Sequence, residues 1–80
     1  MTTKHIHAQD LRVGDVIVYN NYSDKYRHHG VVESIRTVVT EGNTRIHWTM
    51  RLYNKDETYM QRQVDERNAG QILTIERESA

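Results

Sequence analysis

The chain contains no cysteine, so neither a disulfide bond nor a thiolate zinc site is available to hold it together. Its four glycines are scattered, which excludes a glycine-rich loop of the kind that cradles phosphate groups. No apolar run approaches the roughly 18 residues that a membrane helix needs, and the first residues lack the apolar stretch of a secretory signal. These absences favour a cytoplasmic protein with no membrane partner.

The length of 80 residues leaves room for a single domain, which we expect to span residues 1–80. Eleven basic residues balance eleven acidic ones, but they are unevenly spread. Residues 25–62 hold seven Lys or Arg against four Asp or Glu, and residues 63–80 hold two against four. Ordinary surface solvation is the simpler interpretation of so small an imbalance, and a basic face on a central sheet is the alternative.

The strongest structural signal is a hairpin between Val31 and Tyr53. Its second half alternates strictly, which predicts a strand with one buried and one solvated side. The apolar positions are Ile46, Trp48, Met50 and Leu52, and the polar positions are Arg45, His47, Thr49, Arg51 and Tyr53. We therefore expect the apolar set in a core and the polar set on an outer face.

The register of this hairpin follows from its turn. A two-residue connection at Glu41-Gly42 pairs Ile35 with Trp48, Arg36 with His47 and Val31 with Leu52. The same register sets Glu33 opposite Met50 on the buried side. We expect Glu33 to lie at a sheet edge or beside a basic partner.

The rest of the chain predicts further strands at residues 5–7, 16–19, 59–64 and 72–75. Met60 and Val64 are the expected inward residues of the third of these, and residues 65–70 predict a short helical or 3₁₀ turn that ends at Gly70. The fold class is then all-β. The order of elements favours an SH3-like small barrel of about five antiparallel strands with one short helical turn before the last strand, rather than an OB-fold.

The segment Ala8-Gln9-Asp10-Leu11-Arg12-Val13-Gly14-Asp15-Val16-Ile17 resembles the opening of many short β-rich proteins encoded by actinobacterial phages, which share the pattern A-x-D-L-x-x-G-D-x-I. By motif the resemblance covers about the first quarter of the chain, and beyond that only the strand pattern is similar. It implies a small accessory protein that acts within or against a host cell, and hence in the host cytoplasm. It implies no catalytic or binding residue.

Catalysis and metal binding have little support in the sequence. A nucleophile elbow of the Gly-x-Ser-x-Gly type is absent, and an 80-residue barrel leaves little room for a substrate pocket, so we expect no enzyme. His5 and His7 would share one face of a strand, a workable spacing for a metal. Without cysteine or a helical histidine pair, surface histidines are the simpler interpretation, and we expect neither a metal nor a cofactor.

The outer face of the hairpin is the best candidate for function, because aromatic rings stack on bases while arginines hold phosphates. If the next strand pairs Leu52 with Met60, Tyr59, Gln61 and Gln63 join this face. The candidate binding residues are Arg36, Arg45, His47, Arg51 and Tyr53, extended by Tyr22, Tyr26 and Arg27 from the loop before the hairpin. They predict a binding module for nucleic acid, although a plain solvated sheet face would have a similar composition.

The alternative is a protein-interaction module, such as a phage factor that docks on a host protein. Tyrosine is favoured at protein interfaces. The expected anchors are Tyr19, Tyr22, Tyr26 and Tyr53. A barrel of this kind is expected to be a monomer, or a weak homodimer through a strand edge.

Overall fold

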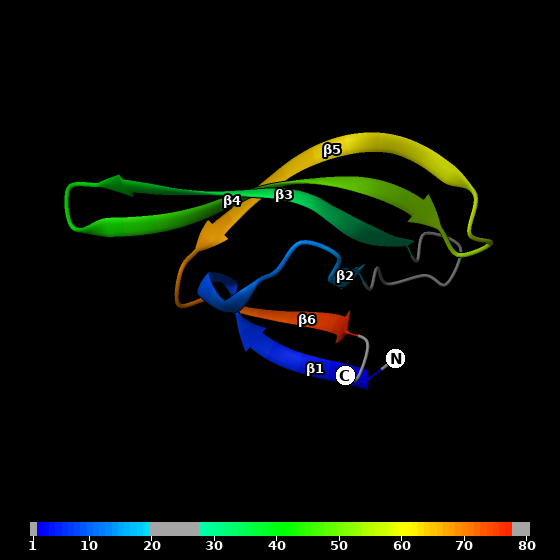
Figure 1. Cartoon of the computed structure of the whole chain (residues 1–80), viewed down its shortest axis with the longest axis horizontal. Helices are drawn as coiled ribbons and strands as arrows, with labels where there is room; N and C mark the ends of the chain where they lie inside the picture. Colours follow the sequence, from blue (N-terminus) through cyan, green and yellow to red (C-terminus); the bar gives the residue numbers. More distant parts are fainter. Residues whose placement is uncertain (1, 20–27, 78–80) are drawn as a thin grey trace.

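In the computed structural model, residues 2–19 and 28–77 are described, and they form one antiparallel sheet (Figure 1). Its strands are β1 (Thr2–His7), β2 (Val16–Tyr19), β3 (His28–Thr40), β4 (Asn43–Asn54), β5 (Tyr59–Asn68) and β6 (Ile72–Arg77), and a 3₁₀ helix, η1 (Ala8–Asp10), follows β1. The strand order is β1-β6-β2-β3-β4-β5. The described residues thus confirm an all-β fold, with six strands where about five were predicted.

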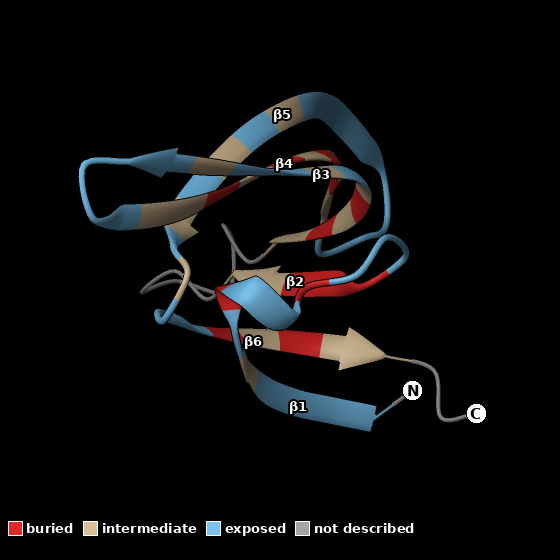
Figure 2. Ribbon diagram, turned by 60° about the vertical axis from the view of Figure 1, so that its left-hand side comes forward, coloured by how far each residue is buried: buried red, intermediate tan, exposed pale blue. Residues whose placement is uncertain are grey.

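The sheet is open. The edge strands β1 and β5 lie at opposite ends of the strand order, and the described chain has no pairing between them (Figure 2). The prediction of a closed barrel is therefore not met. The described residues also contain no helix long and apolar enough to cross a membrane.

The β3–β4 hairpin forms as predicted around Glu41 and Gly42. Thr40 pairs with Asn43, and both central residues have positive φ, 20° and 77°, as a two-residue turn of the primed type requires. Ile35 pairs with Trp48. The turn and the alternation of β4 were sufficient to set this part of the register.

A β-bulge at Glu33 changes the register toward the other end of the hairpin. Val32 pairs with Met50 and Ser34 with Thr49, so Glu33 is the extra residue. Val31 consequently lies opposite Arg51, and the predicted pair of Val31 with Leu52 is wrong. The bulge has a clear physical benefit, because it replaces a carboxylate with Val32 at the buried position opposite Met50.

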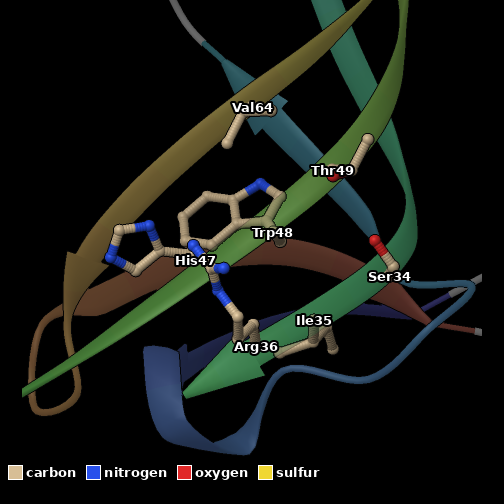
Figure 3. A pocket seen from close by; sticks show the side chains of 7 residues that line it. All are labelled: Ser34, Ile35, Arg36, His47, Trp48, Thr49 and Val64. Atoms are coloured by element: carbon tan, nitrogen blue, oxygen red, sulfur yellow. The ribbon is translucent and has the colours of Figure 1, made fainter. Parts of the chain in front are cut away.

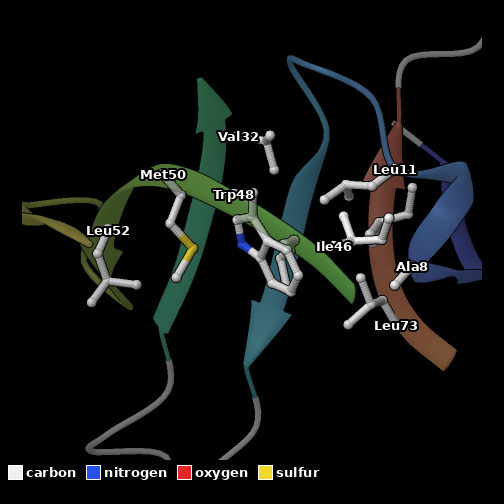
Figure 4. Close-up of a cluster of buried hydrophobic side chains, with 10 residues drawn as sticks. Ala8, Leu11, Val32, Ile46, Trp48, Met50, Leu52 and Leu73 are labelled. Carbon is white, nitrogen blue, oxygen red and sulfur yellow. The ribbon is translucent and has the colours of Figure 1, made fainter. Parts of the chain in front are cut away.

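The core lies on the inner side of β4, where all four apolar positions are buried as predicted. Trp48 is only 1% exposed and occupies the middle of the cluster, between Met50 and Leu52 at one end and Ala8 and Leu73 at the other (Figure 4). The other members are Leu11, Ile17, Val32, Ile46 and Ile75. The core therefore joins β4 to β2, to β6 and to the η1 segment.

Gly30 is required by close packing in this core. It is buried, and a Cβ atom at this position would collide with the side chain of Met50. The absence of a side chain on β3 thus makes room for Met50 on β4.

The predicted helical turn at residues 65–70 is wrong. These residues continue β5, which pairs with β4 as far as Asn68 opposite Arg45, and only a tight turn at Ala69-Gly70 separates β5 from β6. Backbone pairing with a long neighbouring strand overrides the local preference for a turn. The one short helix of the described chain is η1, and it precedes β2.

Met60 and Val64 do not point inward as predicted. They are 54% and 66% exposed. Val64 pairs with Thr49, which lies on the outer face, and Met60 falls at a second irregularity, where the register shifts between Leu52 and Tyr53. The inward positions of β5 are polar or charged instead, namely Gln61, Gln63, Asp65 and Arg67.

Candidate functional site

The outer face of β3, β4 and β5 is ordered in rows that run across the three strands, because residues opposite each other in an antiparallel ladder share a side. The rows are His29–Tyr53–Tyr59, Val31–Arg51–Arg62, Ser34–Thr49–Val64, Arg36–His47–Glu66 and Val38–Arg45–Asn68. The five hairpin residues predicted for the site all lie on this face. The rows differ sharply in chemistry, so the face is not uniformly basic.

The two rows nearest the hairpin tip share one acidic residue, Glu66. Glu66 accepts Arg45 at 3.1 Å and lies 3.0 Å from the Nε2 atom of His47. A further hydrogen bond of 2.8 Å joins Arg45 to Asn68. Two of the predicted binding residues are therefore held in contacts within the sheet.

A second acidic residue lies between two arginines. Glu33, at the bulge, is 3.3 Å from Arg62 and 3.8 Å from Arg51. Two guanidinium groups thus share one carboxylate, which leaves a net positive charge at this place. The side chains of both arginines are more than half exposed, 51% for Arg51 and 65% for Arg62. Arg62 was not predicted, because its row depends on the register of β5.

The row at the far end of the face is aromatic. The rings of His29 and Tyr53 stack at 5.4 Å, and Tyr59 meets Tyr53 edge-on at 5.8 Å. The Arg51 guanidinium lies 5.4 Å from the centre of the Tyr59 ring and 5.8 Å from that of Tyr53. Together with Arg62, these four residues form what we call the aromatic–arginine cluster.

The sequence indicated only part of this cluster. Tyr53 and Arg51 followed from the alternation of β4. Tyr59 was expected on this face from a pairing of Leu52 with Met60, but Leu52 pairs with Gln61. Gln61 and Gln63 consequently lie on the inner side, and Tyr59 reaches the outer face only because of the register shift next to Tyr53.

A shallow trough of about 310 Å³ lies beside the cluster and extends into the row of Arg36 and His47 (Figure 3). Its lining residues come from the three strands and are Ser34, Ile35, Arg36, His47, Trp48, Thr49 and Val64. Short side chains in the middle row create the depression. Arg36 borders it, is exposed, and makes no hydrogen bond or ion pair with any described residue.

The two histidines of β1 contact β6 and the turn that precedes it. A hydrogen bond of 3.1 Å joins the Nδ1 atom of His5 to the hydroxyl of Thr74, and the Nδ1 atom of His7 lies 3.0 Å from the carbonyl oxygen of Gly70. His47 belongs to β4, which is not a neighbour of β1. Across residues 2–19 and 28–77, no three His, Asp or Glu side chains gather closely enough to hold a metal ion.

Tyr22, Tyr26 and Arg27, the predicted loop extension of the site, lie outside the described residues. Their place relative to the face therefore stays a prediction. The site that can be built from the structure consists of the aromatic–arginine cluster, the trough and Arg36.

Neither the family models nor the curated proteins nor the solved structures compared with this chain gave a match. Any functional assignment therefore depends on the geometry of the outer face.

Proposed function

We propose that the chain is a non-enzymatic module that binds single-stranded nucleic acid through the aromatic–arginine cluster. The observation that carries this proposal is the position of the Arg51 guanidinium, 5.4 Å from the ring centre of Tyr59 and 5.8 Å from that of Tyr53. A cation beside two partly exposed rings offers charge and stacking surface at one place, the two contacts that unpaired nucleotides need.

The chemistry of the cluster suits this ligand. A base stacked on Tyr59 contributes about 1–3 kcal/mol, and it does so with little preference for sequence. Arg51 and Arg62 have one carboxylate between them, so one positive charge is available for a phosphate. Arg36 supplies a second charge on the other side of the trough.

The dimensions of the face favour an extended ligand. Tyr53 and His47 are six residues apart on β4, a distance of about 20 Å along a strand. The trough with its short side chains runs between them. A strand of nucleic acid stacked on the tyrosines would cross this trough and reach Arg36.

We also propose that the curled sheet is an SH3-like barrel that remains partly open. Two contacts support it. The amide of Gln9 in η1 donates to the carbonyl of Ala69 beyond β5 at 3.0 Å, so the two ends of the sheet are linked on one side. A hydrogen bond from Tyr19 on β2 to Asp65 on β5 spans the inner face. The resemblance to phage proteins would put such a module in the host cytoplasm.

A protein-interaction module is the second candidate, and the ion pairs of the face favour it. Glu66 and Glu33 reduce the positive potential that a nucleic-acid site normally needs. Tyr59 and Met60 are 49% and 54% exposed at the end of β5. Exposed aromatic and Met side chains beside a polar surface are typical of protein interfaces.

The test compares two arginines that the sequence alone treats as equivalent. We expect Arg51→Ala to weaken the binding of a labelled oligothymidine, measured by fluorescence anisotropy, and to reduce the slope of log K against log salt by about one ion. Arg45→Ala is the matched control, and its effect should be clearly smaller because Glu66 already neutralises this residue. Equal effects of the two substitutions would contradict the assignment of the site to the cluster.

A third variant separates stacking from charge. Tyr59→Ala should weaken oligothymidine binding by about 1–3 kcal/mol with no change in the salt slope. Absence of salt-dependent binding by the parent protein would reject the nucleic-acid proposal. Capture of one host protein in nuclease-treated lysate, lost in Tyr59→Ala and insensitive to salt, would support the second candidate.

A further inference from the structure

The outer edge of β5 is the longest strand edge that the described residues leave unpaired. Nine of its ten residues pair with β4 on one side, and no described strand lies on the other. Such an edge offers a row of backbone donors and acceptors to a further strand. A strand that occupies this edge would do so whether or not the outer face binds nucleic acid.

The phase of the β4–β5 ladder shows which residues face that edge. The amide of Ala69 donates to the carbonyl of Thr44 at 2.9 Å, in register with Arg45 opposite Asn68. In an antiparallel ladder the hydrogen-bonded pairs alternate, so residues 67, 65, 63 and 61 direct their N–H and C=O groups toward β4. The backbone groups of Arg62, Val64 and Glu66 are consequently directed to the open edge.

We propose that two copies of the chain pair antiparallel through β5, with a two-fold axis at Val64. The local sequence Arg62-Gln63-Val64-Asp65-Glu66 is complementary to itself in this arrangement. Arg62 lies opposite the second copy's Glu66 and Glu66 opposite its Arg62, which gives two symmetric ion pairs. Val64, 66% exposed in the single chain, packs against the same residue of the second copy.

The charges discriminate among neighbouring registers. An axis at Arg62, Asp65 or Glu66 sets a like charge directly opposite its copy, which is destabilising. An axis at Gln63 places Arg62 opposite Val64, so that pair of charges is lost. The register centred on Val64 is therefore the favourable one of these five, and it pairs Arg62, Val64 and Glu66, whose backbone groups face the edge.

The charged side chains are free to serve this second role. Arg62 contacts Glu33, and Glu66 contacts Arg45 and His47, but their side chains remain 65% and 48% exposed. A carboxylate accepts more than two donors, so the contacts within the chain need not break. Because opposite residues share a side of the ladder, the outer faces of the two copies would form one continuous surface.

Cysteine cross-linking tests the register directly, since the natural chain has no cysteine. In Val64→Cys the two Cα atoms would be about 5.5 Å apart, within the range of a disulfide. Asn68→Cys is the control on the same edge and face, with its two copies about 27 Å apart along the strands. Under mild oxidation we expect Val64→Cys to cross-link at least tenfold faster, whereas equal rates would overturn the proposal.

Charge exchange provides a second, independent test by sedimentation equilibrium. Arg62→Glu and Glu66→Arg should each lower the dimer fraction at least tenfold in association constant, and the double variant should regain most of it. Lys4→Glu changes the same charge on the opposite edge strand and should leave association unchanged. A parent protein that stays monomeric up to millimolar concentration, or a double variant without recovery, would reject the self-pairing of β5.

Discussion

Tyr19 on β2 donates a hydrogen bond of 3.0 Å to Asp65 on β5, although β3 and β4 lie between these strands in the sheet. The contact crosses the inner side, so the sheet must curl strongly to permit it. Asp65 also accepts Arg67 at 2.7 Å, and the Arg67 guanidinium lies 6.0 Å from the ring centre of Trp48. A polar bridge thus closes the side of the core that β5 leaves without apolar residues.

This bridge predicts a specific response to alkaline pH. Burial, followed by the negative charge of Asp65, raises the pKa of Tyr19 well above its ordinary value of 10.0. The unfolded chain therefore loses this proton first, and stability present below about pH 10 should fall as the pH rises further. Denaturant unfolding followed by Trp48 fluorescence between pH 8 and 11.5 measures this loss.

Tyr19→Phe is the control for that response. The Trp48 side chain opposes the rise in the pKa of Tyr19, and its buried indole N–H has no hydrogen-bond partner among the described residues. Loss of the phenol should cost about 1 kcal/mol of stability at neutral pH, since Asp65 keeps Arg67. The alkaline loss should become shallower in this variant, and an unchanged slope would exclude Tyr19 as its origin.

The inward side of β4 could be predicted because its pattern is local. Alternation over nine residues identifies the buried set whatever the neighbouring strands do. The sequence did not predict the bulge at Glu33. The predicted register placed the Glu33 carboxylate on the buried side opposite Met50, and the pattern of β3 alone does not show that a bulge removes it from there. The turn predicted at residues 65–70 failed because pairing with β4 decides that segment.

The candidate site was predicted less completely because ion pairs between strands depend on register. Arg45 and Arg51 look equivalent in the sequence, yet Glu66 neutralises one while the other shares Glu33 with Arg62. A shift of one residue in β5 would move Glu66 and Arg62 to the inner side, away from Arg45 and Arg51. The outer position of Arg51 followed from alternation. The excess positive charge around Arg51, Arg62 and Glu33 follows only from the pairing of the strands.

Trp48 is the residue whose truncation should damage the fold most. It is 1% exposed and lies at the centre of the core. Trp48→Ala should reduce the free energy of unfolding by roughly 3–5 kcal/mol, close to the whole stability of about 5 kcal/mol expected for a small domain. Urea unfolding followed by circular dichroism checks this, and a fully cooperative transition at the parent midpoint would contradict the assigned core.

The ion pair between the buried Asp15 and the partly exposed Arg77 should be a second point of weakness. Asp15 is 2% exposed and receives two hydrogen bonds from Arg77, at 2.7 and 2.8 Å. The hydrogen bonds to Asp15 raise the pKa of Arg77, so the guanidinium keeps its charge. Arg77→Met leaves a buried carboxylate whose only remaining donor is the Arg12 amide among the described residues, at a cost of about 3 kcal/mol.

The double variant Asp15→Asn with Arg77→Met distinguishes a charge effect from a packing effect. Removal of both charges should recover part of the loss, because the penalty arises mainly from the unpaired carboxylate. Thermal unfolding of the parent, the two single variants and the double variant measures the coupling between the two positions. Additive losses would show that the pair contributes through packing alone.

Glu33 should weaken the binding of nucleic acid to the outer face, because its carboxylate offsets the charge of Arg51 and Arg62. Glu33→Gln removes the carboxylate shared by Arg51 and Arg62 and keeps the size of the side chain at the bulge. If the cluster binds nucleic acid, affinity for oligothymidine should rise about two- to fivefold, the equivalent of an exposed ion pair, and the salt slope should steepen. Glu41→Gln makes the same change in net charge at the hairpin tip, about 26 Å from Glu33 along the strand, and should have little effect. An equal rise in both variants would mean that net charge alone governs binding, and that the aromatic–arginine cluster has no special part in it.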